Sequence, residues 1–275
     1  MPRRDKMTIG IMGAMTEEIS SIVANMKITA REVIADREFI SGSFNGQKCV
    51  TVFSRWGKVA SAITATILFD HFHVASIIFS GVAGSVSDDI TIGDIVISHK
   101  LYQHDMNAEP LFKKFMIPLR DKIDFIPDET LTNIALASAE KFVLDLQKPT
   151  HQLHSALSKF DITQPKALTR CIASGDQFVT KALSHEIVAN RADTAAVEME
   201  GAAVAQVCDE FDKPFVIIRT ISDNANEQAP IDFMAFVTEI AKNYTLGILT
   251  GITDALNREL KRAEKGCILS KPRTN

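Results

Sequence analysis

Residues 195–223 read AAVEMEGAAVAQVCDEFDKPFVIIRTISD, and this stretch carries the clearest information on the fold. Its small and apolar residues between 202 and 207 predict a closely packed helix. The continuous apolar run at 214–218 (PFVII) is typical of a strand in a sheet that is covered on both faces. The stretch therefore predicts a helix followed by a buried strand, which is the pattern of an α/β sheet.

Polar side chains stand at both ends of this stretch. Glu198 and Glu200 precede the predicted helix, and the strand ends in Arg219, Ser222 and Asp223. Ligands of open α/β sheets bind beyond the carboxyl ends of the strands, so these residues indicate a binding site. A buried ion pair between Arg219 and one of the acids is the structural alternative.

The rest of the chain alternates between strand and helix patterns. An Asn-Gly pair at 45–46 predicts a hairpin turn between strands at 39–44 and 48–53. Further strands are predicted within residues 8–15, 76–80, 91–97 and 171–178, helices within 59–72, 128–146, 150–160 and 233–263, and a long loop at 104–119. We expect one domain at residues 7–265, an α/β fold with a wound, mixed central β-sheet flanked by helices, and flexible tails at 1–6 and 266–275.

Composition narrows the class of partner. The 275 residues are 46% apolar and carry a formal net charge of -4, which argues against nucleic acid or an anionic membrane surface as a partner. No segment resembles a membrane span or a secretory signal. The cysteines lie far apart and form no metal-ligand pattern, so we expect a cytoplasmic protein with reduced thiols, without disulfides or zinc; they are Cys49, Cys171, Cys208 and Cys267.

Carboxylates recur beside the predicted strand ends and helix starts. They are Glu18, Asp176, Glu198, Glu200 and Asp223. Such a cluster suits a reaction with a cationic transition state, in which one acid activates water and another assists the leaving group. Cleavage of a bond between a sugar and a nitrogen is one such reaction, although a single Glu at a helix start can simply interact with the helix dipole. Dinucleotide binding is poorly supported, because the glycine turns match neither GxGxxG nor a P-loop.

Seven segments, taken together and in order, resemble the 5'-methylthioadenosine/S-adenosylhomocysteine nucleosidases of the nucleoside phosphorylase superfamily. These segments are 10–18 (GIMGAMTEE), 54–59 (SRWGKV), 81–84 (GVAG), 93–96 (GDIV), 174–178 (SGDQF), 197–200 (VEME) and 219–223 (RTISD). The resemblance implies a nucleoside phosphorylase-like fold, a small nucleoside as substrate and no metal or organic cofactor. It also implies a cytoplasmic homodimer that serves methionine salvage.

The resemblance also implies catalytic roles. Glu18 would be the base that activates water, and Asp223, supported by Ser222, would protonate or hydrogen-bond N7 of adenine. Glu200 would bind the ribose hydroxyls, with its carboxylate positioned by Arg219.

The same resemblance implies contacts to the base and the sugar. Phe178 would stack on adenine, while the backbone groups of Phe178 and Val179 would read its edge. Met199 would pack on the sugar, and Phe233 and Met15 would close over the 5' substituent. Plain core packing is the alternative for the two methionines and Phe233.

Three residues depart from the family pattern. Arg55 and Trp56 stand where the family often has Gly and Ile, and Val82 stands where it often has a small hydroxyl residue. We expect Trp56 to reshape the site near the ribose or the 5' group, with a polar partner for its indole if it is buried. In the long loop, Met106 and Phe112 are candidates for completing the pocket of a partner subunit.

The type of reaction can be argued from charge. A phosphorylase needs cations beside the anomeric carbon, but residues 78–81 (IFSG) contain none and the first glycine turn leads to Glu17 and Glu18. Water is therefore the expected nucleophile, with Arg55 as the residue that could change this conclusion. The alternatives are a hydrolase of aminodeoxyfutalosine or futalosine, a phosphate-dependent nucleoside phosphorylase, and a nucleoside-binding protein without turnover.

Overall fold

The computed structural model describes residues 7–148, 150–225 and 229–269. Within these residues, nine strands form one sheet in the order β2-β3-β4-β1-β5-β8-β7-β6-β9. The strands are β1 (Ile9–Gly13), β2 (Met26–Ile34), β3 (Arg37–Phe44), β4 (Gln47–Phe53), β5 (Ser76–Ser85), β6 (Ile95–Gln103), β7 (Ala167–Ser174), β8 (Thr194–Glu198) and β9 (Phe215–Asp223). The pairing is mixed, so the expected wound, mixed α/β sheet is confirmed.

The strand β9 closes part of this sheet into a ring. It pairs with β5 in parallel and with β6 antiparallel, so that β5, β8, β7, β6 and β9 follow one another around a closed circuit. All nine residues of β9 are buried. This burial confirms the interpretation of residues 215–218 as a strand without a solvent-exposed face, whereas Pro214 is exposed and precedes the strand.

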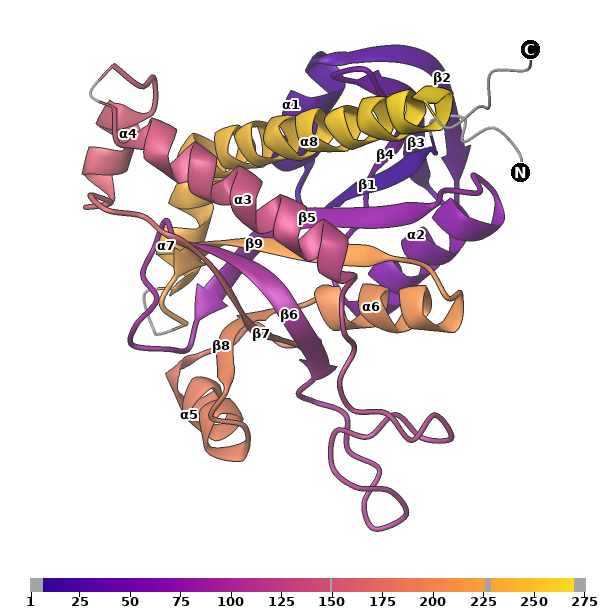
Figure 1. Cartoon of the computed structure of the whole chain (residues 1–275). Helices are drawn as coiled ribbons and strands as arrows, with labels where there is room; N and C mark the ends of the chain where they lie inside the picture. Colours follow the sequence, from indigo (N-terminus) through magenta and orange to yellow (C-terminus); the bar gives the residue numbers. More distant parts are fainter. Residues whose placement is uncertain (1–6, 149, 226–228, 270–275) are drawn as a thin grey trace.

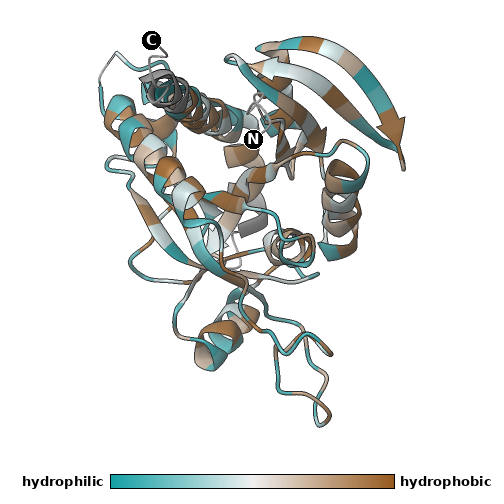
Figure 2. Ribbon diagram, turned by 45° about the vertical axis from the view of Figure 1, so that its right-hand side comes forward, coloured by the Kyte–Doolittle hydropathy of each residue, from teal (hydrophilic) through white to brown (hydrophobic). Residues whose placement is uncertain are grey.

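Helices cover both faces of the sheet (Figure 1). The helices α1 (Thr16–Ala24), α3 (Glu129–Leu146) and α8 (Lys242–Leu269) pack on one face, where they share a hydrophobic core with β1 and β9. The helices α2 (Lys58–Asp70) and α6 (Gly201–Glu210) pack on the other face against a second core. Figure 2 shows hydrophobic and hydrophilic residues alternating along the outer helices, as expected for elements with one buried face.

The hairpin around residues 45–46 is confirmed. β3 and β4 pair antiparallel, with Phe44 opposite Gln47. Asn45 and Gly46 both have positive φ angles, of 48° and 79°, which a type I′ turn requires and which Asn and Gly tolerate best. Local sequence therefore fixes the register of this pair.

Some predicted boundaries were wrong. The strand expected at 91–97 begins only at Ile95, because the Asp94 carboxylate accepts the Thr91 N–H at 2.9 Å and Gly93 adopts a φ of 92°, which makes a turn. β2, β8 and the helix α5 (Lys181–Asn190) were not predicted. β2 is an edge strand in which every residue between Met26 and Ile34 is exposed, so burial of its side chains contributes little to its formation.

The C-terminal part forms one helical segment. The helix α7 (Ala229–Phe236) leads through a π-helical turn, η1 (Val237–Ala241), into α8. Residues 266–269, expected to belong to a flexible tail, lie within α8, whereas the expected tails at 1–6 and 270–275 fall outside the described residues. Among the described residues, no helix combines the length and the apolarity needed to cross a membrane.

Two segments, at 104–119 and 150–160, connect the larger elements. The long loop expected at 104–119 is present, with one isolated bridge between Ile117 and Lys122, and it projects away from the body of the molecule (Figure 1). The polar span at 150–160 contains the short helix α4 (His154–Lys159).

Candidate active site

A cavity of about 330 Å³ lies where β1, β5, β8 and β9 end. The polar ends of β8 and β9 therefore meet at one cavity, in the position where open α/β sheets bind ligands. The lining combines apolar walls with a few carboxylates, the usual character of a small-molecule site. The lining residues are Ala14, Met15, Trp56, Val82, Ala83, Gly84, Gln177, Phe178, Val179, Val197, Glu198, Met199, Glu200, Ser222, Asp223, Ala225 and Phe233.

Most of the residues singled out from the sequence lie in this lining, but Asp176, Arg55 and four others do not. Glu18 and Arg219 are fully buried behind the wall. Met106 and Phe112 belong to the long loop and do not line the cavity of their own chain. The lining residues that the sequence analysis missed are Ala14, Ala83, Gly84, Gln177, Val197 and Ala225, most of which adjoin a predicted residue in the chain.

Glu18 lies in the first turn of α1 and has one anchored oxygen. Its Oε2 accepts the backbone N–H groups of Ala14 at 3.1 Å and Met15 at 3.0 Å. Its Oε1 is buried and has no hydrogen-bond partner within the described part of the chain. Burial raises the pKa of Glu18 to about 7, against the opposing effects of the Arg219 charge and the two backbone hydrogen bonds.

A carboxylate with these properties suits a general base. Its pKa lies close to neutral pH, where a base can both lose and accept a proton readily. The anchored oxygen fixes the orientation of the group, and the unpartnered oxygen can accept a proton from water.

Asp223 is the last residue of β9 and its carboxylate is held at both oxygens. Oδ2 accepts from the Ser222 hydroxyl at 2.9 Å, and Oδ1 accepts the Ala225 N–H at 2.9 Å. Gly84 permits this arrangement, since a Cβ atom at that position would lie 2.7 Å from Oδ1. The chain therefore fixes the rotamer of Asp223 at the cavity wall.

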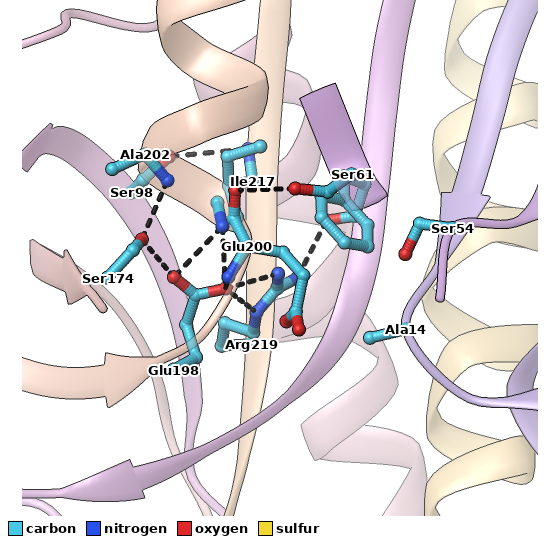
Figure 3. A network of polar contacts seen from close by, with 12 residues as sticks. Ala14, Ser54, Ser61, Ser98, Ser174, Glu198, Glu200, Ala202, Ile217 and Arg219 are labelled. Carbon is cyan, nitrogen blue, oxygen red and sulfur yellow. Dashed lines mark hydrogen bonds and ion pairs between the residues drawn. The ribbon is translucent and has the colours of Figure 1, made fainter. Parts of the chain in front are cut away.

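Arg219 and Glu198 form a buried ion pair (Figure 3). The Nη2 and Nε atoms of Arg219 donate to Glu198 Oε2 at 2.7 and 3.2 Å. Glu198 also accepts from the Ser174 hydroxyl and from the Gly201 N–H at the start of α6. The expected contact of Arg219 with the Glu200 carboxylate is therefore replaced by this pair, and the alternative of a buried ion pair holds.

Glu200 is held by a different partner. Its Oε1 accepts the Gly57 N–H at 2.8 Å, in the turn that connects β4 to α2. Gly57 has a φ of 90°, a conformation that favours glycine and that directs its N–H to the carboxylate. Burial, and then the negative charge of Glu198, raise the pKa of Glu200.

Trp56 and the phenylalanines form the rim of the cavity. The Trp56 indole N–H donates to the Ala14 carbonyl at 2.9 Å, which supplies the expected polar partner although the side chain is 57% exposed. Phe178 and Phe233 lie edge to face, with ring centroids 6.0 Å apart. An aromatic pair at the mouth of an apolar cavity suits the binding of a planar base.

Cations are lacking at this cavity. Among its described lining residues there is no Arg or Lys. Arg55, which could have provided an anion site, donates to the Asp36 carbonyl at 2.6 Å and lines a separate cavity beside α1 and β3. In the described part of the chain, no three His, Cys, Asp or Glu side chains gather in a manner that could hold a metal ion.

A protein-family model described as the phosphorylase superfamily matches residues 8–253. The chain belongs to the phosphorylase superfamily. A 5'-methylthioadenosine/S-adenosylhomocysteine nucleosidase of Shewanella loihica is 34% identical to this superfamily member over 245 residues, which cover 89% of the chain and 98% of the relative. The resemblance carried by the seven sequence segments is thereby confirmed.

Solved structures of the superfamily agree with the fold. The nucleosidase of Colwellia psychrerythraea 34H, solved with adenine, has a TM-score of 0.78 and 30% identity, and the match covers 92% of this chain and 96% of that one. The futalosine hydrolase of Helicobacter pylori has a TM-score of 0.76 and 32% identity, over 91% and 98% of the two chains. The expected nucleoside phosphorylase-like fold is therefore confirmed.

Proposed function

We propose that this enzyme is a purine nucleosidase that hydrolyses the N-glycosidic bond of 5'-methylthioadenosine and S-adenosylhomocysteine. The observation that carries the proposal is the position of two acids beside one cavity: Glu18, buried behind its wall with one unpartnered oxygen and a pKa of about 7, and the fixed carboxylate of Asp223 in the wall itself. The nucleosidases among the relatives support the choice of substrate.

In the proposed reaction, Glu18 takes a proton from water at Oε1 while the oxygen attacks the anomeric carbon. Asp223 donates a proton or a hydrogen bond to N7, so that adenine leaves as a neutral base. The electron pair of the glycosidic bond passes to adenine, and the ribose carries cationic charge in the transition state.

The remaining contacts orient the nucleoside. Glu200 binds the ribose hydroxyls from the position set by Gly57, and Met199 packs on the sugar. Phe178 stacks on the base, and the backbone groups of Phe178 and Val179 read its edge. Met15 and Phe233 enclose the 5' substituent.

Water is favoured over phosphate as the nucleophile by the charge of the site. A phosphate dianion needs positive partners, and the described lining of the cavity offers carboxylates instead. Arg219 is not available for this purpose, since Glu198 neutralises it behind the cavity wall.

We further propose a cytoplasmic homodimer that acts in methionine salvage, within one domain at residues 7–265. Exposed apolar side chains support self-association: Leu111 and Leu119 of the projecting loop are 84% and 89% exposed. The Phe112 side chain lies in the same loop and could enter a partner's site, whereas Met106 packs partly against the core of its own chain. Sedimentation of the protein and of Leu111→Asp tests this, since the change should shift a dimer towards monomer.

Product analysis tests the proposed reaction. Purified protein is incubated with 5'-methylthioadenosine, S-adenosylhomocysteine or futalosine, with and without phosphate, and the base is separated from the sugar. Adenine and a free sugar, independent of phosphate, are expected from the first two substrates, and Asp223→Asn should abolish their release. A sugar phosphate would indicate phosphorolysis. Turnover of futalosine alone would favour the second candidate, which the similarity to the Helicobacter pylori enzyme supports.

A further inference from the structure

Three charged residues connect two segments that border the cavity, namely the turn before α2 and the loop after β7. Lys58 donates its backbone N–H to Asp176 Oδ1 at 2.8 Å and its ammonium group to Asp105 Oδ1 at 2.6 Å. Asp176 in turn donates its backbone N–H to Asp105 Oδ2 at 2.9 Å. Each residue thus contacts both of the others, and we call Lys58, Asp105 and Asp176 the clamp.

Within the clamp, Asp176 is exposed to solvent, whereas the ion pair between Lys58 and Asp105 is partly shielded. The side chains of Lys58 and Asp105 are 16% and 20% exposed, so their ion pair is screened less than one on the open surface. Burial alone would raise the pKa of Asp105, but the hydrogen bonds from Lys58 and from Asp176 outweigh it, and the pKa lies below its ordinary value. Gln103 also accepts from the Lys58 ammonium group, at 3.1 Å.

Each end of the clamp adjoins a different part of the site. Lys58 begins α2 and directly follows Gly57, whose N–H holds the Glu200 carboxylate. Asp176 precedes the rim residue Phe178 by two positions, in the loop that leaves β7. The clamp therefore joins the segment that positions the sugar carboxylate to the segment that borders the base.

The loop after β7 is also held by a tight steric contact with His104. The imidazole of His104 packs against Gly175, where a Cβ atom would lie 2.3 Å from Nε2. Burial lowers the pKa of His104, which favours the neutral form of the ring. The loop can then shift relative to α2 only if the contacts of the clamp break.

We propose that Lys58, Asp105 and Asp176 are positioning residues that set the distance between the sugar side and the base side of the site. The proposal rests on the proposed nucleosidase function. It predicts that the clamp matters most for ligands that occupy both sides at once. A ligand confined to one side, such as adenine, should depend on it much less.

Lys58→Met and Asp105→Asn test the clamp, because both remove the ion pair and leave the cavity lining unchanged. Loss of a hydrogen bond to a charged group corresponds to about a tenfold effect or more. We expect KM for 5'-methylthioadenosine to rise about tenfold, while kcat and the Kd for adenine change by less than about threefold. Asp176→Asn keeps an acceptor for the Lys58 N–H. Its KM should therefore lie closer to that of wild type than the KM of Asp176→Ala.

Lys122→Met is the matched control. Lys122, like Asp105, lies in the connection between β6 and α3. It pairs with Asp209 near the end of α6, outside the cavity lining. This variant should leave KM and the Kd for adenine unchanged.

The outcomes separate the two proposals. Wild-type protein that binds 5'-methylthioadenosine without releasing adenine would contradict the proposed function, and the Kd values of nucleoside and base would then test the clamp in place of KM. An equal loss of affinity for nucleoside and adenine would overturn the clamp proposal. A lower Tm with unchanged KM would overturn it as well, since that is the result of a purely structural ion pair.

Discussion

Glu18→Gln separates the catalytic and the energetic consequences of burying a carboxyl group. The variant keeps an oxygen that can accept the N–H groups of Ala14 and Met15, but it cannot ionise. As the proposed base is lost, turnover should fall by at least about a hundredfold. In wild type, kcat/KM should fall about tenfold for each pH unit below about 7, because only the ionised carboxylate accepts a proton.

The same substitution should lower turnover but raise the free energy of unfolding at neutral pH. The pKa of Glu18 rises from 4.5 to about 7 on folding, chiefly through burial, so the folded state binds the proton more tightly than the unfolded state. Its stabilising contribution is present below pH 4.5 and is lost as the pH rises to about 7. At about 1.4 kcal/mol for each pH unit, the loss amounts to about 3 kcal/mol.

Urea unfolding measured from about pH 4 to about pH 8 tests this value. The free energy of unfolding of Glu18→Gln, minus that of wild type, should increase by about 3 kcal/mol over this range and then stay constant. Glu17→Gln is the control, because the neighbouring Glu17 side chain is partly exposed to water. If this difference in the free energy of unfolding does not change with pH, burial does not raise the pKa of Glu18 and the reasoning is refuted.

Two further changes test the supports of the site. Trp56→Phe keeps an aromatic wall but removes the hydrogen bond to the Ala14 carbonyl, so kcat/KM should fall about three- to tenfold; an unchanged value in steady-state assays would contradict this. Arg219→Met leaves the Glu198 carboxylate buried without its cation and should cost about 3–5 kcal/mol in urea unfolding. Arg31→Met, in which an exposed ion pair is lost, should cost at most about 1 kcal/mol and serves as its control.

The sequence predicted the parts of the fold that local patterns determine. The buried strand β9 followed from its apolar run, and the hairpin between β3 and β4 followed from Asn45 and Gly46. The edge strand β2 could not be predicted, because it is stabilised by pairing with β3 and not by burial of its own side chains. Closure of the ring by β9 depends on contacts between segments far apart in the chain, which no local pattern reveals.

The candidate site was predicted to a similar extent. The end of a predicted strand indicated Asp223, the start of a predicted helix indicated Glu198 and Glu200, and the structure places all three at the cavity. The partner of Arg219 could not be chosen from the sequence, since Glu198 and Glu200 are only two residues apart. Pairing of β8 with β7 beside Ser174 decides the choice in favour of Glu198.

The clamp was not predicted either. Its residues come from three separate segments, and each is an ordinary charged surface residue when taken alone. Only the arrangement of β6, β7 and α2 brings them into contact.

The most direct test of the central claim is the origin of the oxygen that replaces adenine on the sugar. The reaction with 5'-methylthioadenosine is run in oxygen-18 water that also contains phosphate, and the sugar is analysed at once by mass spectrometry, before its anomeric hydroxyl exchanges with solvent. Hydrolysis assisted by Glu18 predicts one heavy oxygen on the anomeric carbon. A sugar phosphate without the label would contradict the account.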